Sequence, residues 1–355
     1  MGPLQDDTVR IASLNINNLG VRAFSNPKQD SLKNWIYDNE IGIIGLQEVG
    51  VAFHMQKKYD KLQERMRDAR WKKIRISQAN NICEKVEVAQ YGGTAVMAYD
   101  EIAARVTSKA GQDTSGLGRW AWLLFEGKYG HRTRVISAYN PCKSRGPETV
   151  YMQQVRYFQK QGINECPRTL FRKQLCSQIV KWQLQGDLIV LLIDCNENLT
   201  RWGPLHKSLL HECKLIDPIR LAYQTESCSL PPTSLTGSVP IDSIFVSQQL
   251  RHIQQGGWLK QGETVGDHRP LYVDIPIMTI LGEPPFKIHR PEARRLTCEQ
   301  PKVIDRFNIL FQRQMEMENT EKNFDILMEN IKHNSMSKKD IEIDDKIYRS
   351  LISKI

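Results

Sequence analysis

The sequence predicts an α/β domain followed by a helical extension. Eight short apolar runs of strand length are bounded by Gly, Asn or Asp, and four stretches with a helical pattern lie between them. No fixed-period repeat is present, which argues against solenoids and propellers. Of the 355 residues, 40% are hydrophobic and 25% are charged, as in globular proteins that bury a large core.

The strand-like runs and helical patterns alternate irregularly, as in α/β domains. Strands are expected at 9–15, 41–47, 92–99, 118–127, 133–140, 187–194, 241–247 and 271–276. Helices are expected at 27–38, 57–70, 148–160 and 169–184. The first and third of these helical patterns begin at or just behind a proline, a residue common in the first helical turn.

The composition of the sequence changes near Pro276. Four prolines punctuate the next stretch, and a polar, Met-rich helical pattern follows over 301–334 without further strand-like runs. We therefore expect one domain over residues 1–277, and a proline-punctuated linker with a helical extension over residues 278–355. The last stretch, 335–355, carries mixed charges and is expected to be a helix or a loosely held tail.

The net charge, the cysteines and the targeting signals narrow the functional classes to which the protein can belong. The sequence has 49 Lys and Arg against 40 Asp and Glu, a net charge of +9, which favours a polyanionic partner. The eight cysteines form no C-x-x-C pair and no zinc-type cluster with histidine, so reduced and mostly buried thiols are expected. The sequence shows no signal peptide and no apolar run of membrane-spanning length, so an intracellular protein is expected.

Polar residues gather where the strand-like runs begin or end. Each one alone is explained by a turn or a cap. Glu48 and Asp194 differ, because a carboxylate that closes a strongly apolar run is costly to bury unless it is paired or bound to a cation. The full set, in chain order, is Asn15, Asn17, Glu48, Tyr139, Asp194, Asn196, Asp242, Asp267 and His268.

The order N…QE…Y-x-P…D-x-N…ID…DH, from about Val9 to Ile275, resembles the endonuclease/exonuclease/phosphatase superfamily. The segments "SLNINNLG" and "GLQEV" are similar to the apurinic-type endonuclease domains of non-LTR retrotransposons. The resemblance implies a four-layer α/β sandwich, in which two packed β-sheets are flanked by helices. It also implies a metal-dependent DNA endonuclease that nicks target DNA for retrotransposon integration, with a nuclear site of action.

Three positions depart from the pattern. Repair-type apurinic endonucleases have an acid where this chain has Asn17, which weakens a role in abasic-site repair. Ile193 stands where the superfamily usually has Gly, and Gly266 where Ser is common. None of the three replaces a group assigned a chemical role.

The resemblance implies a role for each polar residue. Glu48, with Asn15 and Asp267, would bind Mg²⁺, for which Mn²⁺ could substitute. Asp194 would orient or deprotonate the attacking water, and Asn196 would donate a hydrogen bond to the phosphate.

The remaining roles concern the phosphate and the histidine. His268 would be either a charged donor to a phosphate oxygen or a general base, with Asp242 fixing its tautomer. Asp267 would lie near the metal or brace this network. Tyr139 would donate to the phosphate or to the leaving oxygen.

DNA binding would need a basic face. Lys and Arg cluster at 72–75, 130–134, 142–146 and 168–173, and the irregular loop 231–240 is a candidate for reading the shape of a DNA groove. A reverse-transcriptase domain, absent from this chain, is a possible downstream partner. Two alternatives remain open: a phosphatase or phospholipase of the same fold, and a truncated, inactive nucleic-acid-binding module.

Overall fold

The computed structural model describes residues 2–21, 26–82, 89–225, 229–259, 265–284, 301–317 and 319–332. The chain divides into two compact units, Met1–Pro285 and Phe286–Ile355, and each is described by itself. Among the described residues, all strands belong to the first unit, and the second unit consists of two helices.

The described part of the first unit contains twelve strands and eight α-helices. The strands are β1 (Thr8–Asn15), β2 (Ile41–Gln47), β3 (Ile74–Ala79), β4 (Thr94–Tyr99), β5 (Val106–Gln112), β6 (Trp120–Glu126), β7 (Arg132–Tyr139), β8 (Leu188–Asp194), β9 (Leu215–Ile216), β10 (Asp242–Ser247), β11 (Gln255–Trp258) and β12 (Leu271–Pro276). The helices are α1 (Pro27–Asp38), α2 (Leu62–Arg65), α3 (Asp100–Ala104), α4 (Val150–Lys160), α5 (Pro167–Leu184), α6 (Pro204–His211), α7 (Pro218–Thr225) and α8 (Ile277–Leu281).

The strands form two six-stranded sheets of related topology. The first has the order β11-β12-β1-β2-β4-β3, and the second has the order β5-β6-β7-β8-β10-β9. Each sheet contains one parallel pair, β1 with β2 and β7 with β8, and its other pairs are antiparallel. The C-terminal ends of the two strands in a parallel pair therefore open at the same edge of their sheet.

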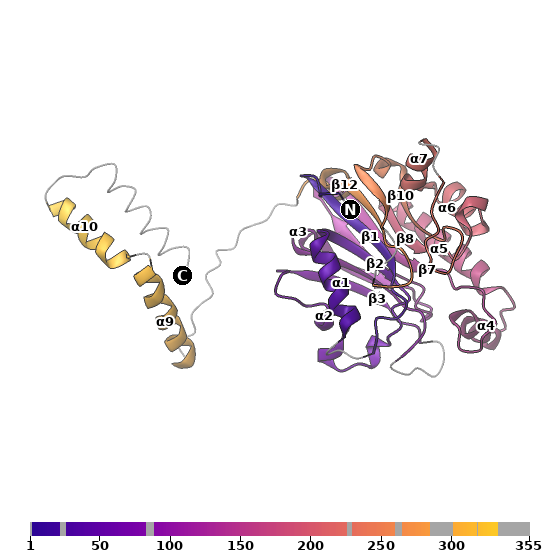
Figure 1. Ribbon diagram of the computed structural model, residues 1–355, viewed down its shortest axis with the longest axis horizontal. Coiled ribbons are helices and arrows are strands. Elements are labelled where there is room, and N and C mark those ends of the chain that lie inside the picture. The colour runs from indigo at the N-terminus through magenta and orange to yellow at the C-terminus, as the bar shows by residue number, and fades with distance from the viewer. Residues whose placement is uncertain are drawn as a thin grey trace. The chain divides into compact units, whose positions relative to one another are not determined.

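Three apolar cores separate four layers. The core between the sheets contains Ile11 of β1 and Leu192 of β8. A second core, with Ala12 and Trp35, lies between the first sheet and α1, and a third, with Leu191, lies between the second sheet and α5. Successive residues of a strand point to opposite faces, so both sheets are buried on both faces. Figure 1 shows α1 beside β1 and β2, and α5 and α6 beside β8, which confirms the predicted four-layer α/β sandwich.

The sequence pattern located the interior of both sheets. All eight predicted runs form strands, namely β1, β2, β4, β6, β7, β8, β10 and β12. The helices predicted at 27–38, 148–160 and 169–184 are confirmed as α1, α4 and α5.

The helix predicted over 57–70 is wrong. Only a short 3-10 turn and the four-residue helix α2 form there, separated by Lys61 in an extended conformation. The side chain of Arg65, which is 3% exposed, donates hydrogen bonds to the backbone carbonyls of Asp60, Gly20 and Val21. These long-range hydrogen bonds outweigh the helical propensity of the segment.

The second unit contains α9 (Pro301–Met317) and α10 (Thr320–Lys332), which contact each other and confirm the helical pattern of this region. The tail over 335–355 lies outside the described residues. Among the described helices, none has the length and apolar character needed to cross a membrane. The described cysteines are Cys142, Cys166, Cys176, Cys195 and Cys213. All five are free thiols, and the last three are buried.

The helix α8 packs tightly against the rest of the first unit. Ile280 and Leu281 are almost fully buried in the core between the sheets, and Arg105 donates to three successive backbone carbonyls beginning at Leu281. Ending the chain after Met278 would remove both apolar side chains, and we expect a loss of about 4 kcal/mol in the free energy of unfolding. Ending it after Pro284 should leave the stability of this unit unchanged. Urea unfolding of the two shortened chains compares them, and equal midpoints would contradict this account of α8.

Candidate active site

The chemistry-bearing residues stand where the central strands begin or end. Asn15 is the last residue of β1, and Glu48 directly follows β2. Tyr139 and Asp194 end β7 and β8 and are partners in the parallel register. Asp242 begins β10 opposite Asp194 in the antiparallel register. The topology therefore gathers these side chains from both sheets at one end of the sandwich.

Asn15 joins carboxylates from two sheets. Its Nδ2 donates hydrogen bonds of 2.8 Å to Glu48 Oε2 and of 2.8 Å to Asp194 Oδ2. The hydroxyl of Tyr139 donates a 2.6 Å hydrogen bond to Glu48 Oε1. Asn15 is only 1% exposed and its hydrogen bond to Asp194 is fully buried, which strengthens it, whereas Glu48 is partly exposed.

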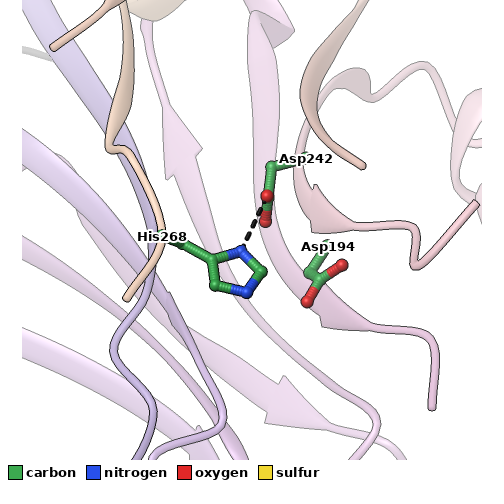
Figure 2. Close-up of side chains that lie close together, drawn as sticks. All are labelled: Asp194, Asp242 and His268. Carbon is green, nitrogen blue, oxygen red and sulfur yellow. Dashed lines mark hydrogen bonds and ion pairs between the residues drawn. The ribbon is translucent and has the colours of Figure 1, made fainter. Parts of the chain in front are cut away.

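A histidine and an aspartate complete the site. His268 Nδ1 lies 2.8 Å from Asp242 Oδ2, and both side chains are buried. Figure 2 shows the other ring nitrogen of His268 on the side of Asp194. One potential ligand atom from each of Asp194, Asp242 and His268 lies within 4.8 Å of the others. The pair thus fixes the imidazole and leaves its second nitrogen directed toward the carboxylates.

Burial and mutual charge set the protonation of the site. Burial, followed by the charge of Asp242, raises the pKa of Asp194 well above its usual range, although His268 opposes this. Burial acts to lower the pKa of His268, but the charge and the hydrogen bond of Asp242 raise it to about 10. Burial and the nearby charges of Glu48 and Asp194 hold the pKa of Tyr139 well above the ordinary value of a phenol. At neutral pH the site therefore presents an imidazolium and a neutral phenol.

The backbone has a positive φ at three of the residues singled out from the sequence, and that of Asn17 is 43°. Glu48 and Asn196 have φ angles of 49° and 47°, in the left-handed region that non-glycine residues rarely adopt. Asn196 is held there by its neighbours, since its Nδ2 donates to Asn140 O at 2.8 Å and its backbone N–H donates to Asp194 Oδ1 at 2.9 Å. Asn140 Nδ2 in turn donates to Cys195 O at 2.7 Å.

Asp267, in the loop before β12, lies at the edge of the site. It contacts Asn17 on the segment that joins β1 to α1. Its Oδ2 accepts a 2.9 Å hydrogen bond from Asn17 Nδ2, while its Oδ1 is buried and accepts none from the described residues. Lys28 Nζ donates to Asn17 O at 2.8 Å. Burial lowers the pKa of Lys28, and the charge of Asp267 opposes this. Asn17, where repair enzymes have an acid, is therefore a hydrogen-bond donor to Asp267.

The donor set fits a hard divalent cation. Carboxylate and amide oxygens are the ligands that Mg²⁺ binds in proteins. Glu48, Asp194, Asp242 and Asp267 bring four carboxyl groups to one end of the fold, and a single imidazolium, His268, offsets their charge. Asp194 and Asp242 are buried, and buried carboxylates in such an excess need a cation or added protons. The unpartnered Asp267 Oδ1 is a further oxygen available to such an ion.

Two supporting residues were not identified from the sequence. Thr233, which is fully buried, accepts hydrogen bonds at Oγ1 from the backbone N–H groups of Ile241 and Asp242, and its carbonyl accepts from Arg269 N. It therefore joins the strand that carries Asp242 to the loop that carries His268. No local pattern marks a threonine so far from either partner in the sequence.

Arg168, at the start of α5, belongs to the basic cluster 168–173. Its guanidinium donates to the carbonyls of Pro141 and Asn196 at 2.9 and 3.0 Å, and forms a 3.3 Å ion pair with Glu197. It thus ties together the two turns that follow β7 and β8. An arginine just after a helix-starting proline gives no signal of such a contact.

The four basic clusters do not share one face. Clusters 142–146 and 168–173 follow β7 and begin α5, at the end that holds the site. Cluster 72–75 leads into β3, whose first residue pairs with the last residue of β4, and cluster 130–134 leads into β7. Both lie a strand length, about 20 Å, from the site. Both arginines of cluster 130–134 also share an ion pair there with the single carboxylate of Asp187.

Three solved structures are similar to this chain. The catalytic domain of human Nocturnin with bound sulfate matches at 15% identity and a TM-score of 0.53, over 77% of this chain and 96% of that chain. AP endonuclease LMAP from Leishmania major matches at 11% identity and a TM-score of 0.56, over 76% and 88%. The catalytic domain of APE2 from Xenopus laevis matches at 16% identity and a TM-score of 0.52, over 76% and 92%.

No protein-family model matches the sequence, and no curated protein matches it. The likeness covers 88–96% of each solved structure, and the TM-scores of 0.52 to 0.56 show a common fold. The chain therefore shares the fold of these three proteins, and this fold is the four-layer α/β sandwich that its sequence predicts.

Proposed function

We propose that the chain is a Mg²⁺-dependent phosphodiesterase, and specifically a DNA endonuclease that nicks target DNA for retrotransposon integration in the nucleus. The observation that carries the proposal is the hydrogen-bonded set of Asn15, Glu48, Tyr139 and Asp194, with the pair of His268 and Asp242 beside it. A phosphodiester needs charge neutralisation, an activated water and a stabilised leaving oxygen. These side chains supply donors and acceptors for all three needs.

Glu48, with Asn15 and Asp267, would hold the Mg²⁺, and Mn²⁺ could take its place. When bound, the cation would neutralise charge on the scissile phosphate. Asn15 would keep the Glu48 and Asp194 carboxylates at a fixed separation through its two hydrogen bonds. The free Oδ1 of Asp267 supports its inclusion in this set.

Side chains of the protein would activate the water and stabilise the phosphate and the leaving oxygen. Asp194 would accept a proton from the attacking water, a task suited to a carboxylate whose pKa is raised. His268 would donate from Nε2 to a phosphate oxygen, because an imidazolium with a pKa of about 10 has no free lone pair to act as a base. Tyr139 would donate to the phosphate or the leaving oxygen, and Asn196 would donate to a phosphate oxygen.

DNA is favoured over the other phosphoesters by the charge around the site. Lys143 and Arg145 are exposed on the turn that follows β7, the strand that ends at Tyr139. Asn17 in place of an acid favours the retrotransposon type of enzyme over abasic-site repair. A downstream reverse transcriptase would then be a partner outside this chain.

Substrate class can be tested directly. We expect nicking of supercoiled plasmid with Mg²⁺, and turnover of a soluble phosphomonoester, an inositol phosphate and sphingomyelin vesicles at least about a hundredfold slower, because only DNA engages several cations at once. Initial rates at equal enzyme concentration give the comparison. Faster release of phosphate from the monoester would favour the phosphatase alternative, and plasmid binding without nicking would favour an inactive nucleic-acid-binding module.

A further inference from the structure

A polar bridge joins the two sheets just below the candidate active site. Gln47, the last residue of β2, is fully buried, and its side chain reaches from the first sheet to the second. Its Nε2 donates to Ser137 Oγ at 3.1 Å, to Leu192 O at 3.3 Å and to Ser13 Oγ at 3.3 Å. Ser137 Oγ links the sheets a second time, by donating a 2.8 Å hydrogen bond to Leu46 O. We call Gln47, Ser13, Ser137 and Leu192 the inter-sheet bridge.

The inter-sheet bridge lies on the strands that carry the site. Three of its residues each stand two positions before a residue of the site on the same strand. The pairs are Ser13 with Asn15 on β1, Ser137 with Tyr139 on β7, and Leu192 with Asp194 on β8. Gln47 directly precedes Glu48. Because side chains two positions apart on a strand point to the same face, the bridge and the site occupy neighbouring levels between the two sheets.

The two sheets approach each other closely at the bridge. Gly45 stands two residues before Gln47 and faces the second sheet, as Gln47 does. A Cβ at Gly45 would lie 2.7 Å from Leu192 Cδ1 and 3.2 Å from Ser137 Cβ. A side chain at this position would therefore push the sheets apart. Glycine permits the close approach, and the hydrogen bonds of Gln47 fix it.

Stability alone gives no reason for a glutamine at this position. The surrounding core between the sheets is apolar and contains Ile11, Ile43 and Val135. Gln47 Oε1 is buried and has no hydrogen-bond partner among the residues that the structure describes. A buried acceptor without a partner destabilises a fold, and methionine would fill a similar volume without one. What the glutamine adds is a set of hydrogen bonds to the second sheet.

We propose that Gln47 is a positioning residue, which holds Glu48 of the first sheet at a fixed distance from Asp194 of the second. The inference rests on the proposed phosphodiesterase function. Glu48 and Asp194 come from different sheets and share the amide of Asn15 as a hydrogen-bond donor. Without the bridge, the sheets can shift against each other at this end while the apolar cores persist. The two carboxylates would then lose the spacing that a cation and an attacking water need.

The Gln47→Met variant tests the inference, because it keeps the volume of the side chain and removes its hydrogen bonds. We expect kcat for supercoiled plasmid to fall about tenfold, KM to change less than about twofold, and the Mg²⁺ concentration at half of the maximal rate to rise about fivefold. The urea midpoint should equal or exceed that of the wild type, because the unpaired acceptor is gone. A glutamine that only supported the fold would give a lower midpoint and an unchanged kcat.

Gln154→Met is the matched control. Gln154, in α4, is also fully buried, and neither polar atom of its side chain has a hydrogen-bond partner among the described residues. The same substitution is therefore made at a second buried glutamine that does not link the sheets. We expect its kcat and its dependence on Mg²⁺ to equal those of the wild type.

Ser137→Ala breaks the bridge from the second sheet. It removes the acceptor of one hydrogen bond from Gln47 and the donor of the hydrogen bond to Leu46 O. We expect kcat to fall in this variant too. Because both substitutions break the same link, the double variant should fall little further than Gln47→Met alone, whereas independent effects would multiply.

Cation binding provides a readout that is independent of cleavage. Binding of Mn²⁺ to the protein without DNA can be followed by the electron paramagnetic resonance signal of the free ion. We expect Gln47→Met to bind Mn²⁺ about fivefold more weakly than the wild type, and Gln154→Met to bind it equally well.

The outcomes separate the two hypotheses. A wild type that binds Mn²⁺ without nicking, together with weaker binding by Gln47→Met, would refute the phosphodiesterase and retain the positioning role. Wild-type nicking, together with an unchanged kcat and an unchanged Mn²⁺ affinity in Gln47→Met, would overturn the positioning role and retain the phosphodiesterase. An equal loss of kcat in Gln154→Met would assign the effect to core packing and would also overturn the positioning role.

Discussion

Replacing Glu48 by glutamine should reduce Mg²⁺-dependent nicking of supercoiled plasmid by at least about a hundredfold. The substitution keeps the size of the side chain and removes its negative charge. Glu48 accepts hydrogen bonds at both oxygens, from Asn15 and from Tyr139, and a glutamine can accept at only one of these positions. The variant would thus lose both the charge that attracts the cation and one of the hydrogen bonds that fix the site.

The comparison needs a variant with the same charge change elsewhere. Glu165→Gln serves, because Glu165 is partly exposed just before α5, and its ion pair in the described part of the chain is with Lys173. We expect this control to nick at the wild-type rate and all three proteins to unfold at similar urea concentrations. DNA binding in EDTA should survive in Glu48→Gln, since surface cations supply most of it. Unchanged nicking by Glu48→Gln would show that Glu48 and the polar residues around it do not form the metal-dependent active site.

Replacing His268 by alanine should lower the nicking rate by a similar factor of at least about a hundred. The substitution removes the only imidazolium of the site and leaves the buried Asp242 without its partner. Initial rates are again measured on supercoiled plasmid, with the urea midpoint recorded to verify folding. A His268→Ala variant that folds and nicks at the wild-type rate would rule out the histidine as a donor to the phosphate.

The Asp242→Asn variant tests whether nicking needs the positive charge of His268 or only the presence of its ring. In the wild type the carboxylate raises the pKa of His268 to about 10, so the imidazolium persists from pH 6 to pH 9 and this group should not limit the rate there. Without the carboxylate, burial lowers that pKa against the remaining charges of Asp194 and Asp267, so the donor form is lost at a lower pH than in the wild type. The ratio of wild-type to variant rates should therefore grow between pH 6 and pH 8. A constant ratio would indicate that Asp242 acts only by orienting the ring.

The interior of the fold was predictable from the sequence, and its edges were not. All eight predicted strands pair on both sides within their sheets, and their continuous apolar runs reflect burial on two faces. The four missed strands, β3, β5, β9 and β11, are the edge strands of the two sheets. Edge strands are short or polar, as β3 is, with residues that alternate in exposure, so their apolar signal is weak.

The candidate site was predictable to a similar degree. Strand ends in a parallel arrangement meet at one edge, which is why Asn15, Glu48 and Asp194 could be expected to converge. The sequence did not reveal that Asn15 would donate to both carboxylates, because this depends on the register between two separate sheets. Nor could it separate the basic clusters, since their position follows from the direction of each strand.

The most direct test of the account is the rate of supercoiled plasmid nicking by the wild-type chain as a function of Mg²⁺ concentration. We expect no nicking in EDTA, a rate that rises with Mg²⁺ to a plateau, and recovery of the EDTA-treated protein when Mg²⁺ or Mn²⁺ is returned. Nicking at an equal rate in EDTA, or bound plasmid that stays intact at every concentration of either cation, would contradict a metal-dependent phosphodiesterase built on these strand ends.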